Sequence, residues 1–191
     1  MPSELTRLVT QQVPLQAADV TLISAAFEEA DYAKGALLVA PQQPARYMFF
    51  LLEGFTRGFH YQPDGAEITN HLSGPLHFVT AYTSFLSGAP SEETVQALTA
   101  CRVARISKAR LDELYRQSHA MALFGLLMSE RYLLFNNQRG KDLISLSATA
   151  RYEKLLREEP LLARHVPLRY IASYLGIKPE SLSRIRRQLI S

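Results

Sequence analysis

The sequence contains only one cysteine, Cys101, and no tryptophan. A lone cysteine cannot form an intramolecular disulfide, and it cannot supply the several thiolates that hold an iron–sulfur cluster. The five histidines are scattered and show neither HxxxH nor Cys/His ligand spacing. The sequence therefore predicts no disulfide, no metal site and no cofactor.

Long apolar runs and catalytic motifs are also missing. The longest apolar run covers residues 120–128, which is far too short to cross a bilayer. The first residues, up to Gln12, are polar and lack the basic, apolar and small-residue order of a signal peptide. Neither a G-x-S-x-G nucleophile motif nor a glycine-rich phosphate loop occurs. With 47% hydrophobic and 20% charged residues, the chain is predicted to be a folded cytoplasmic protein that is neither an enzyme nor bound to a membrane.

Residues 166–189 contain two short helical patterns on either side of a glycine. The first pattern has an apolar face at i, i+3, i+4 and i+7, formed by Leu168, Ile171, Ala172 and Leu175. Gly176 then stands where the chain needs a left-handed residue, and Pro179 suits the first position of the next helix. The buried stripe of that second helix is predicted to consist of Leu182, Ile185 and Leu189. Two helices around a glycine turn, the second with a polar face, form the helix-turn-helix arrangement, whose second helix enters the DNA major groove.

The charge distribution distinguishes a DNA-binding motif from a helical hairpin with a purely structural role. Residues 164–191 contain six Lys or Arg residues against one acid, Glu180. This segment carries +5 in a chain whose net charge is +3, so the rest of the chain carries −2. A basic end on a slightly acidic body is the pattern of phosphate-backbone binding. The charge therefore favours double-stranded DNA as a partner over a structural hairpin or a merely solvated cationic face.

Between residues 34 and 107, short β-rich runs alternate with Gly, Pro and Asp. The segment Pro63-Asp64-Gly65 predicts a hairpin, because proline presets φ and glycine accepts a positive φ. Many short strands separated by tight turns are typical of a β-sandwich, barrel or jelly roll. A helix is expected before this region over residues 17–30, and a short helical piece is expected to interrupt the strands within residues 78–89.

From residue 108 onward the periodicity is helical. A long helix is predicted over residues 119–138, and Pro160 is expected to end a further helix before a linker turn. The long helix is apolar nearly all round, with large side chains at Met121, Phe124, Leu127, Met128, Leu134 and Phe135. Such a helix must be covered on more than one side. The simplest explanation is a core helix within one domain.

Three features together resemble the cyclic-AMP receptor / fumarate-nitrate regulator (Crp/Fnr) family of bacterial transcription factors, over nearly the whole chain. They are the helix-turn-helix YIASYLGIKPESLSRIRR, the segment ACRVARISKARLDELY, and the pattern Lys34-Gly35, Glu53-Gly54 and Arg57. The resemblance implies an α+β chain. Its parts would be an N-terminal double-stranded β-helix (jelly-roll), cyclic-nucleotide-binding-like sensor domain over residues 1–115, a dimerisation helix over 116–142 and a helix-turn-helix domain over 143–191. The last domain is expected to lack a full wing, because no β-hairpin follows its second helix.

The same resemblance implies how the chain would act on DNA. The long helix would pack against its twin in a homodimer, which would set two recognition helices about one DNA turn, roughly 34 Å, apart. A near-palindromic site would then be required. RNA polymerase is a further partner that the resemblance implies.

By resemblance, the first turns of the second helix supply the base contacts, which here are Lys178, Pro179, Glu180, Ser183 and Arg184. Arg184 can donate a bidentate pair to guanine, and Glu180 can accept from cytosine N4. Family members often carry a basic residue where this chain has Pro179, so one base contact is expected to be missing or replaced. The residues expected to contact phosphates, which position without specifying, are Arg169, Arg186 and Arg187.

The effector pocket departs from the pattern of family members that bind cyclic AMP, which show Gly-Glu-Leu and then Arg-Ser. An alignment without gaps places Ala81 at the ribose-binding carboxylate and Ser91, followed by Glu92, at the phosphate-binding arginine. A carboxylate near this site would repel an anion. The resemblance therefore implies a degenerate pocket that does not bind cyclic AMP in the usual manner. Phe78, Tyr82 and Phe85 make the region aromatic, which suits either an apolar ligand or a collapsed, ligand-free core.

The leading interpretation is a homodimeric, sequence-specific DNA-binding regulator of transcription, whose effector is absent or is not cyclic AMP. Two other interpretations stay open. One is a ligand-binding or protein-interaction module with a decayed helix-turn-helix, and the other is an unusual cyclic-nucleotide sensor. A preference among duplexes distinguishes the first interpretation from the second, and titration with a cyclic nucleotide tests the third.

Overall fold

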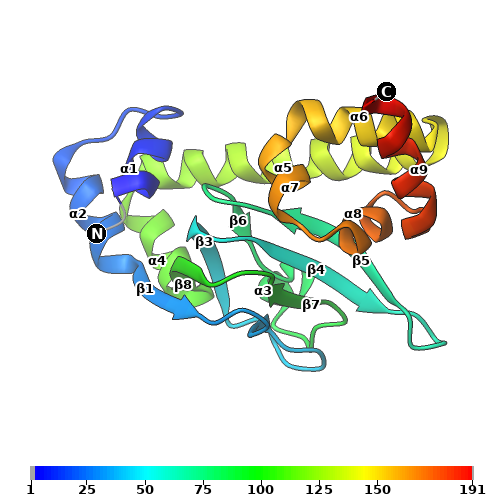
Figure 1. Cartoon of the computed structure of the whole chain (residues 1–191). Coiled ribbons are helices and arrows are strands. Elements are labelled where there is room, and N and C mark those ends of the chain that lie inside the picture. The colour runs from blue at the N-terminus through cyan, green and yellow to red at the C-terminus, as the bar shows by residue number, and fades with distance from the viewer. Residues whose placement is uncertain (1–2, 191) are drawn as a thin grey trace.

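Two four-stranded antiparallel sheets form a jelly roll in the first part of the chain (Figure 1). The structure is a computed structural model that describes residues 3–190. One sheet has the order β1-β8-β3-β6, with β1 at Glu28–Tyr32, β8 at Cys101–Ser107, β3 at Tyr47–Glu53 and β6 at Phe78–Val79. The other has the order β2-β7-β4-β5, with β2 at Leu37–Val39, β7 at Thr94–Ala97, β4 at Thr56–Tyr61 and β5 at Glu67–Ser73. The predicted jelly roll is confirmed.

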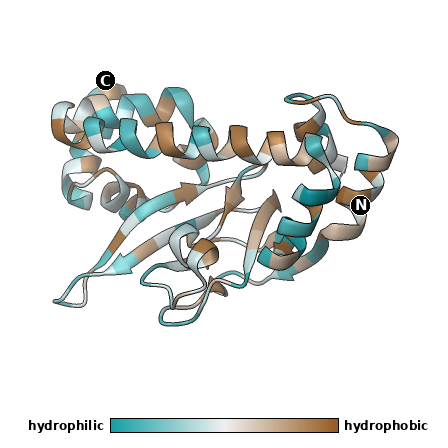
Figure 2. Cartoon of the chain, turned by 180° about the vertical axis from the view of Figure 1, so that it is seen from behind, coloured by the Kyte–Doolittle hydropathy of each residue, from teal (hydrophilic) through white to brown (hydrophobic). Residues whose placement is uncertain are grey.

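The helices surround this roll and then form the C-terminal part of the molecule. Before the roll lie α1 (Ser3–Thr10) and α2 (Ala17–Ala26), and α3 (Tyr82–Ser87) interrupts the strands where a helical piece was predicted. After the roll come α4 (Lys108–Gln117), α5 (His119–Ser145), α6 (Ala148–Glu158), α7 (Pro160–His165), α8 (Leu168–Tyr174) and α9 (Pro179–Ile190). Helix α5 spans the length of the molecule and carries hydrophobic residues along most of it (Figure 2).

The core of the roll is built mainly from β3 and β8 and is closed by the first turns of α5. Strand β3 buries four consecutive residues, from Phe49 to Leu52, because both of its faces are covered. Strand β8 instead places Val103 and Ile106 in the core and leaves Arg102 exposed. Phe124 of α5 completes the same cluster.

The turns of the roll follow the predicted residues. Gly65 has a φ of +83° in the hairpin between β4 and β5, where the Gln62 N–H donates to the Ala66 carbonyl at 2.8 Å. Gly54 has a φ of +94°, and a Cβ there would collide with the Ala100 carbonyl oxygen. Glycine is therefore required at Gly54 by close approach and favoured at Gly65 by its backbone conformation.

Three expected boundaries are wrong. The helix expected over residues 17–30 ends at Ala26, because Glu28–Tyr32 instead pairs antiparallel with β8 as an edge strand. The long helix continues beyond residue 138 to Ser145. The expected linker turn after Pro160 is the short helix α7, in which proline takes the first position, where its missing N–H costs nothing.

The C-terminal helices pack against the roll through a second apolar cluster. Phe55, Leu72 and Leu98 of the roll join Leu162 of α7 and Ile171 of α8 in this cluster. The Phe55 and His165 rings also stack, with their centroids 4.8 Å apart. The helix-turn-helix is therefore fixed to the roll by burial as well as by its chain connection.

Candidate nucleic-acid interface and effector pocket

The turn between α8 and α9 has the predicted glycine geometry. Gly176 has a φ of +68°, and its N–H donates to the Ser173 carbonyl at 3.0 Å. The Ile177 N–H donates to the Ala172 carbonyl at 3.0 Å. These bonds satisfy carbonyls at the end of α8 and aim the chain into α9.

Helix α9 is held by a short buried stripe. Leu182 is fully buried and Ile185 is nearly so, as predicted. The third predicted member is wrong, because Leu189 is 42% exposed in the last turn. Two buried side chains therefore hold the first two turns of the helix, which is the part expected to reach base edges.

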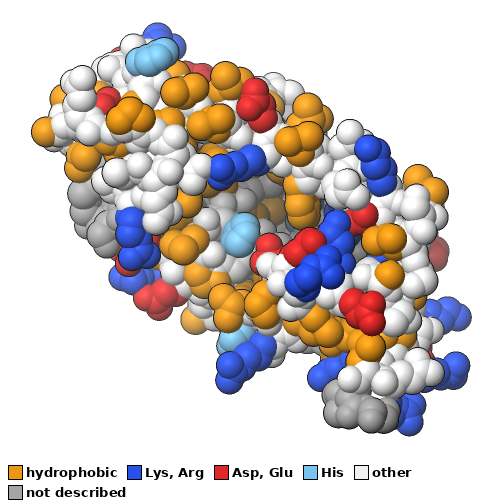
Figure 3. All heavy atoms as spheres, turned by 90° about the horizontal axis from the view of Figure 1, so that it is seen from above, with side chains coloured by type: hydrophobic (Ala, Val, Ile, Leu, Met, Phe, Trp, Pro, Cys, Tyr) orange, Lys and Arg blue, Asp and Glu red, His pale blue; other side chains and the backbone are white. Residues whose placement is uncertain are grey.

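The opposite face of α9 is open to solvent. The five residues expected to read bases lie just before α9 or in its first two turns, and all of them are exposed: Lys178, Pro179, Glu180, Ser183 and Arg184. The Ser183 hydroxyl donates to the Pro179 carbonyl at 3.0 Å and can turn toward a ligand instead. Lys and Arg side chains gather around the C-terminal end of the molecule (Figure 3).

The three expected phosphate contacts lie in different surroundings. Arg187 is exposed and Arg186 half-buried on α9. Arg169 lies on α8, where its guanidinium donates to the Tyr170 hydroxyl at 2.7 Å. Arg186 and Arg187 therefore share a helix with the base-reading residues, whereas Arg169 lies on the preceding helix.

The residues at the degenerate effector pocket already satisfy one another. The Ser91 hydroxyl, buried in the roll, donates to the Glu93 carbonyl at 2.7 Å and accepts from its N–H at 3.1 Å. Glu93 accepts a hydrogen bond from Asn70, and burial raises the pKa of this carboxyl. Ala81 is buried just before α3, whereas Glu92 is exposed. Ala81 offers no carboxylate for a ribose, and Ser91 and Glu92 offer no arginine for a cyclic phosphate.

Aromatic rings of the roll and α5 pack together beside this pocket. The Tyr82 and Tyr132 ring centroids are 4.6 Å apart, and the Tyr82 hydroxyl lies 3.2 Å from the Ser129 hydroxyl. The His71 ring stacks on Tyr132 and Phe135, with centroids 5.9 and 6.2 Å apart. Burial, aided by the nearby Arg139 charge, lowers the pKa of His71 to about 4, so the ring is neutral near pH 7. These contacts favour the collapsed core over an apolar ligand.

The other predicted pocket rings also belong to the core. Phe78 packs against Phe50 and Phe124, with centroids 5.0 and 6.0 Å apart, and Phe85 is almost fully buried. Sequence reasoning missed His71 and Tyr132, because they lie far apart in the chain and neither belongs to a recognisable motif.

The six apolar residues singled out on the long helix divide into two groups. Met121 and Phe124 are buried in the core of their own roll, and Leu127 and Met128 are half-buried against it. Leu134 and Phe135 are 67% and 46% exposed. Helix α5 also exposes Leu126 in its first half and Leu133 and Ile144 in its second half.

Two kinds of site are absent from residues 3–190. Within that range, no three His, Cys, Asp or Glu side chains gather in a way that could hold a metal ion. None of the helices in the same range is long and apolar enough to cross a membrane.

Comparison with known proteins identifies the roll. Residues 29–118 match the family model of the cyclic nucleotide-binding domain. Comparison with curated proteins finds no match.

Solved structures extend the similarity to the whole architecture. FixK2 from Bradyrhizobium japonicum is 20% identical, with a TM-score of 0.74 over 85% of this chain and 84% of that chain. The c-di-GMP responsive global regulator CLP from Xanthomonas campestris is 22% identical, with a TM-score of 0.67 over 91% of both chains. A protein of Eubacterium rectale described as a transcriptional regulator of the Crp/Fnr family is 17% identical, with a TM-score of 0.68 over 91% of this chain and 83% of that chain. The predicted resemblance is confirmed at the level of the fold.

Proposed function

We propose that this protein is a homodimeric, sequence-specific DNA-binding regulator of transcription. The proposal starts from two findings: residues 29–118 belong to the cyclic nucleotide-binding domain family, and the chain has the fold of Crp/Fnr regulators. Such a regulator would act in the cytoplasm, where bacterial DNA lies. RNA polymerase is the further partner that this function implies.

One observation carries the proposal: the first turns of α9 present an exposed polar and cationic face, while Leu182 and Ile185 hold the opposite face. A helix held in this way can enter the major groove while its buried face stays packed against the rest of the protein. The segment around it carries the positive charge of the chain, which favours binding to phosphates.

The side chains divide into those that read bases and those that position the helix. Arg184 would donate two hydrogen bonds to guanine, and Glu180 would accept from cytosine N4. Lys178 and Ser183 can reach neighbouring edges, whereas Pro179 has no polar group to offer. Arg186 and Arg187 would bind phosphates from the same helix, and Arg169 would do so only after leaving the Tyr170 hydroxyl.

The exposed apolar residues of α5 support the homodimer. Leu133, Leu134 and Ile144 are 69%, 67% and 88% exposed, which is unusual for large apolar side chains on one helix. Packing this helix against its twin would bury them. A two-fold axis would then place two α9 helices on one face of a near-palindromic duplex.

The pairing of polar groups at Ser91 and Glu93 supports a roll that does not respond to cyclic AMP. The proposal is therefore that the effector is absent or has a different chemistry. A second class of function, a ligand-binding or protein-interaction module with a decayed helix-turn-helix, would be favoured by an absence of any duplex preference.

Selection from a random duplex pool, followed by fluorescence anisotropy across a salt series, tests the proposal. We expect a near-palindromic site and a steep loss of affinity with salt. Arg184→Ala should cost about 1–3 kcal/mol of binding free energy and relax the preference at one guanine. Arg187→Ala should instead weaken binding to all duplexes and reduce the salt slope by about one.

Arg116→Ala is the matched control, because it removes the same charge from an exposed position on α4, where Arg116 pairs with Glu113. Its affinity should equal that of the parent. Equal affinities of the parent and Arg184→Ala for the selected site would refute the proposal.

A further inference from the structure

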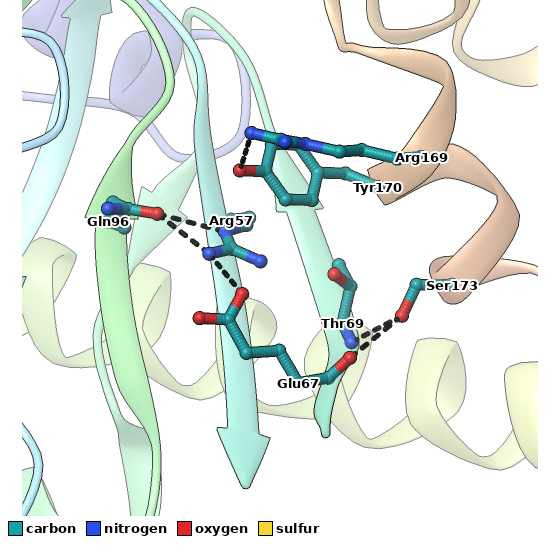
Figure 4. A pocket seen from close by; sticks show the side chains of 7 residues that line it. All are labelled: Arg57, Glu67, Thr69, Gln96, Arg169, Tyr170 and Ser173. Carbon is teal, nitrogen blue, oxygen red and sulfur yellow. Dashed lines mark hydrogen bonds and ion pairs between the residues drawn. The ribbon is translucent and has the colours of Figure 1, made fainter. Parts of the chain in front are cut away.

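Arg57, on the face of β4 that α8 covers, is an almost fully buried charge. Its side chain is 4% exposed, and its guanidinium donates from Nε and Nη2 to Gln96 Oε1 at 3.0 and 2.9 Å. It also forms an ion pair with Glu67 at 2.6 Å (Figure 4). A buried arginine with these partners is fixed in position and has its charge balanced within the roll.

The guanidinium of Arg57 also contacts aromatic rings, one of which belongs to the helix-turn-helix. Its central carbon lies 3.9 Å from the ring centroid of Phe59 on β4 and 4.0 Å from that of Tyr170 on α8. Arg57 therefore contacts one ring from each part. Such contacts are attractive, most of all when they are shielded from water.

A second contact joins α8 to the edge of the sheet. Strand β5 ends the order β2-β7-β4-β5, so its outward N–H and C=O groups need partners. The buried Thr69 N–H donates to the Ser173 hydroxyl of α8 at 2.9 Å, and that hydroxyl donates to the Glu67 carbonyl at 3.5 Å. The Ser173 hydroxyl thus provides the hydrogen-bond acceptor and donor that a further strand would otherwise provide at this edge.

The polar part of the contact borders solvent, beside the buried cluster that holds α8 to the roll. Arg57, Glu67, Thr69, Gln96, Tyr170 and Ser173, together with Arg169, line a cavity of about 490 Å³ that is open to solvent. Water can therefore reach the polar groups when α8 moves away. The apolar cluster that contains Leu72, Leu162 and Ile171 keeps α8 attached to the roll when these polar contacts open.

Helix α9 is turned away from this contact. Glu180, Ser183 and Arg184 stay exposed while Tyr170 and Ser173 touch the roll. The contact therefore leaves the reading face uncovered and constrains only its orientation.

We propose that Arg57, Tyr170 and Ser173 form an interlock that positions α9, the helix expected to contact bases (the reading helix), relative to the roll. The inference rests on the proposed DNA-binding function and names the residues that set its geometry. With the interlock closed, both α9 helices of a dimer hold one spacing. With it open, they sample many orientations, and the apparent Kd rises in proportion to the loss of the competent population.

Tyr170→Leu removes the ring that stacks on Arg57, and Ser173→Ala removes the edge hydroxyl. We expect each to raise the Kd for the selected duplex several-fold and the pair to raise it about tenfold, the change expected if about one molecule in ten stays competent. The salt slope should not change in Ser173→Ala, because no phosphate contact is lost or gained. In Tyr170→Leu the Arg169 guanidinium loses the Tyr170 hydroxyl and becomes able to bind a phosphate, which should make the slope steeper by up to about one. Tyr170→Phe keeps the ring over Arg57 and releases Arg169 in the same way, so the difference in Kd between Tyr170→Leu and Tyr170→Phe measures the stacking contact alone.

Amide hydrogen exchange tests the interlock without DNA. The Thr69 N–H should exchange at least tenfold faster in the double variant, while core amides such as that of Val103 keep their rates. Tyr61→Leu is the control, because Tyr61 packs edge-on against Phe59 and is half exposed on β4. It should leave both affinity and Thr69 exchange unchanged.

The outcomes separate the two proposals. A parent protein that selects no duplex would refute the proposed function, and Thr69 exchange would still decide whether the interlock restrains α8. Faster exchange with unchanged affinity would overturn the positioning role. The interlock itself would be overturned if neither Ser173→Ala, the mildest variant, nor Tyr170→Leu changed Thr69 exchange or duplex affinity.

Discussion

The reading helix and the effector pocket treat their polar side chains in opposite ways. On α9, Glu180 and Arg184 point into solvent and depend on a ligand for close partners. At the pocket, Ser91 bonds to Glu93, and Glu93 accepts from Asn70, so the Ser91 hydroxyl and the Glu93 carboxylate have their partners inside the protein. An unpaired charge that is exposed to water costs little folding free energy, whereas an unpaired charge in the interior costs much more. The comparison suggests that one site is kept for binding and that the other has become part of the core.

Removing the support of α9 should have the largest effect. Leu182 is fully buried between the two helices of the motif, so Leu182→Ala should cost about 2–5 kcal/mol of unfolding free energy. Urea unfolding measures this loss, and anisotropy should show that DNA binding is lost with it. Leu189→Ala, at a position 42% exposed, should change stability by no more than about 0.5 kcal/mol. Similar losses in the two variants would mean that the stripe does not hold the helix.

A pH change should act on the pocket and hardly on the reading helix. The pKa of His71 is about 4 in the folded chain, below its usual value, so the folded state disfavours the proton. The stabilisation is complete above the usual histidine pKa of about 6.5 and is lost as pH falls toward 4, by on the order of 3 kcal/mol. Urea unfolding at pH 7 and pH 4.5 measures it.

His71→Leu isolates this contribution, because all other acid-sensitive groups remain. The variant should lose less stability than the parent over the same pH interval. An equal loss in both proteins would show that His71 is not kept neutral by its packing on Tyr132 and Phe135.

Cyclic AMP should have the smallest effect, namely none. The pocket offers buried Ala81 and self-bonded Ser91 where a carboxylate and an arginine would be needed. Calorimetric titration with cyclic AMP or cyclic GMP should be flat, and duplex affinity should be the same with and without them. A saturable heat of binding would contradict the collapsed pocket and favour the unusual cyclic-nucleotide sensor.

The helix-turn-helix could be predicted almost completely from the sequence, because its signals are local. The spacing of Ile171, Ala172 and Leu175 and the left-handed Gly176 require only the neighbouring residues. The roll was predicted from the same kind of signal, since Gly54 and Gly65 mark turns within a few residues of their strands. The base-reading and dimer residues remain predictions until they are measured.

Elements whose conformation depends on distant partners were missed. Helix α1 has a polar sequence, but it folds over the core by burying Leu5 and Val9. Residues 28–30 continue a helical pattern, and yet they form a strand, because β8 offers hydrogen bonds that a helix end would not. Local propensity is weak compared with such tertiary contacts.

The sequence by itself therefore determined the kind of protein: a punctuated β-roll, a long apolar helix and a basic helix-turn-helix. Only the tertiary structure decided how these parts meet. The Thr69 N–H donates to the Ser173 hydroxyl, which lies 104 positions away in the sequence, and the Tyr170 ring contacts Arg57 from a similarly distant segment. Periodicity reports which face of an element is buried, but it carries no information about which element covers that face. That choice depends on the packing of the whole chain.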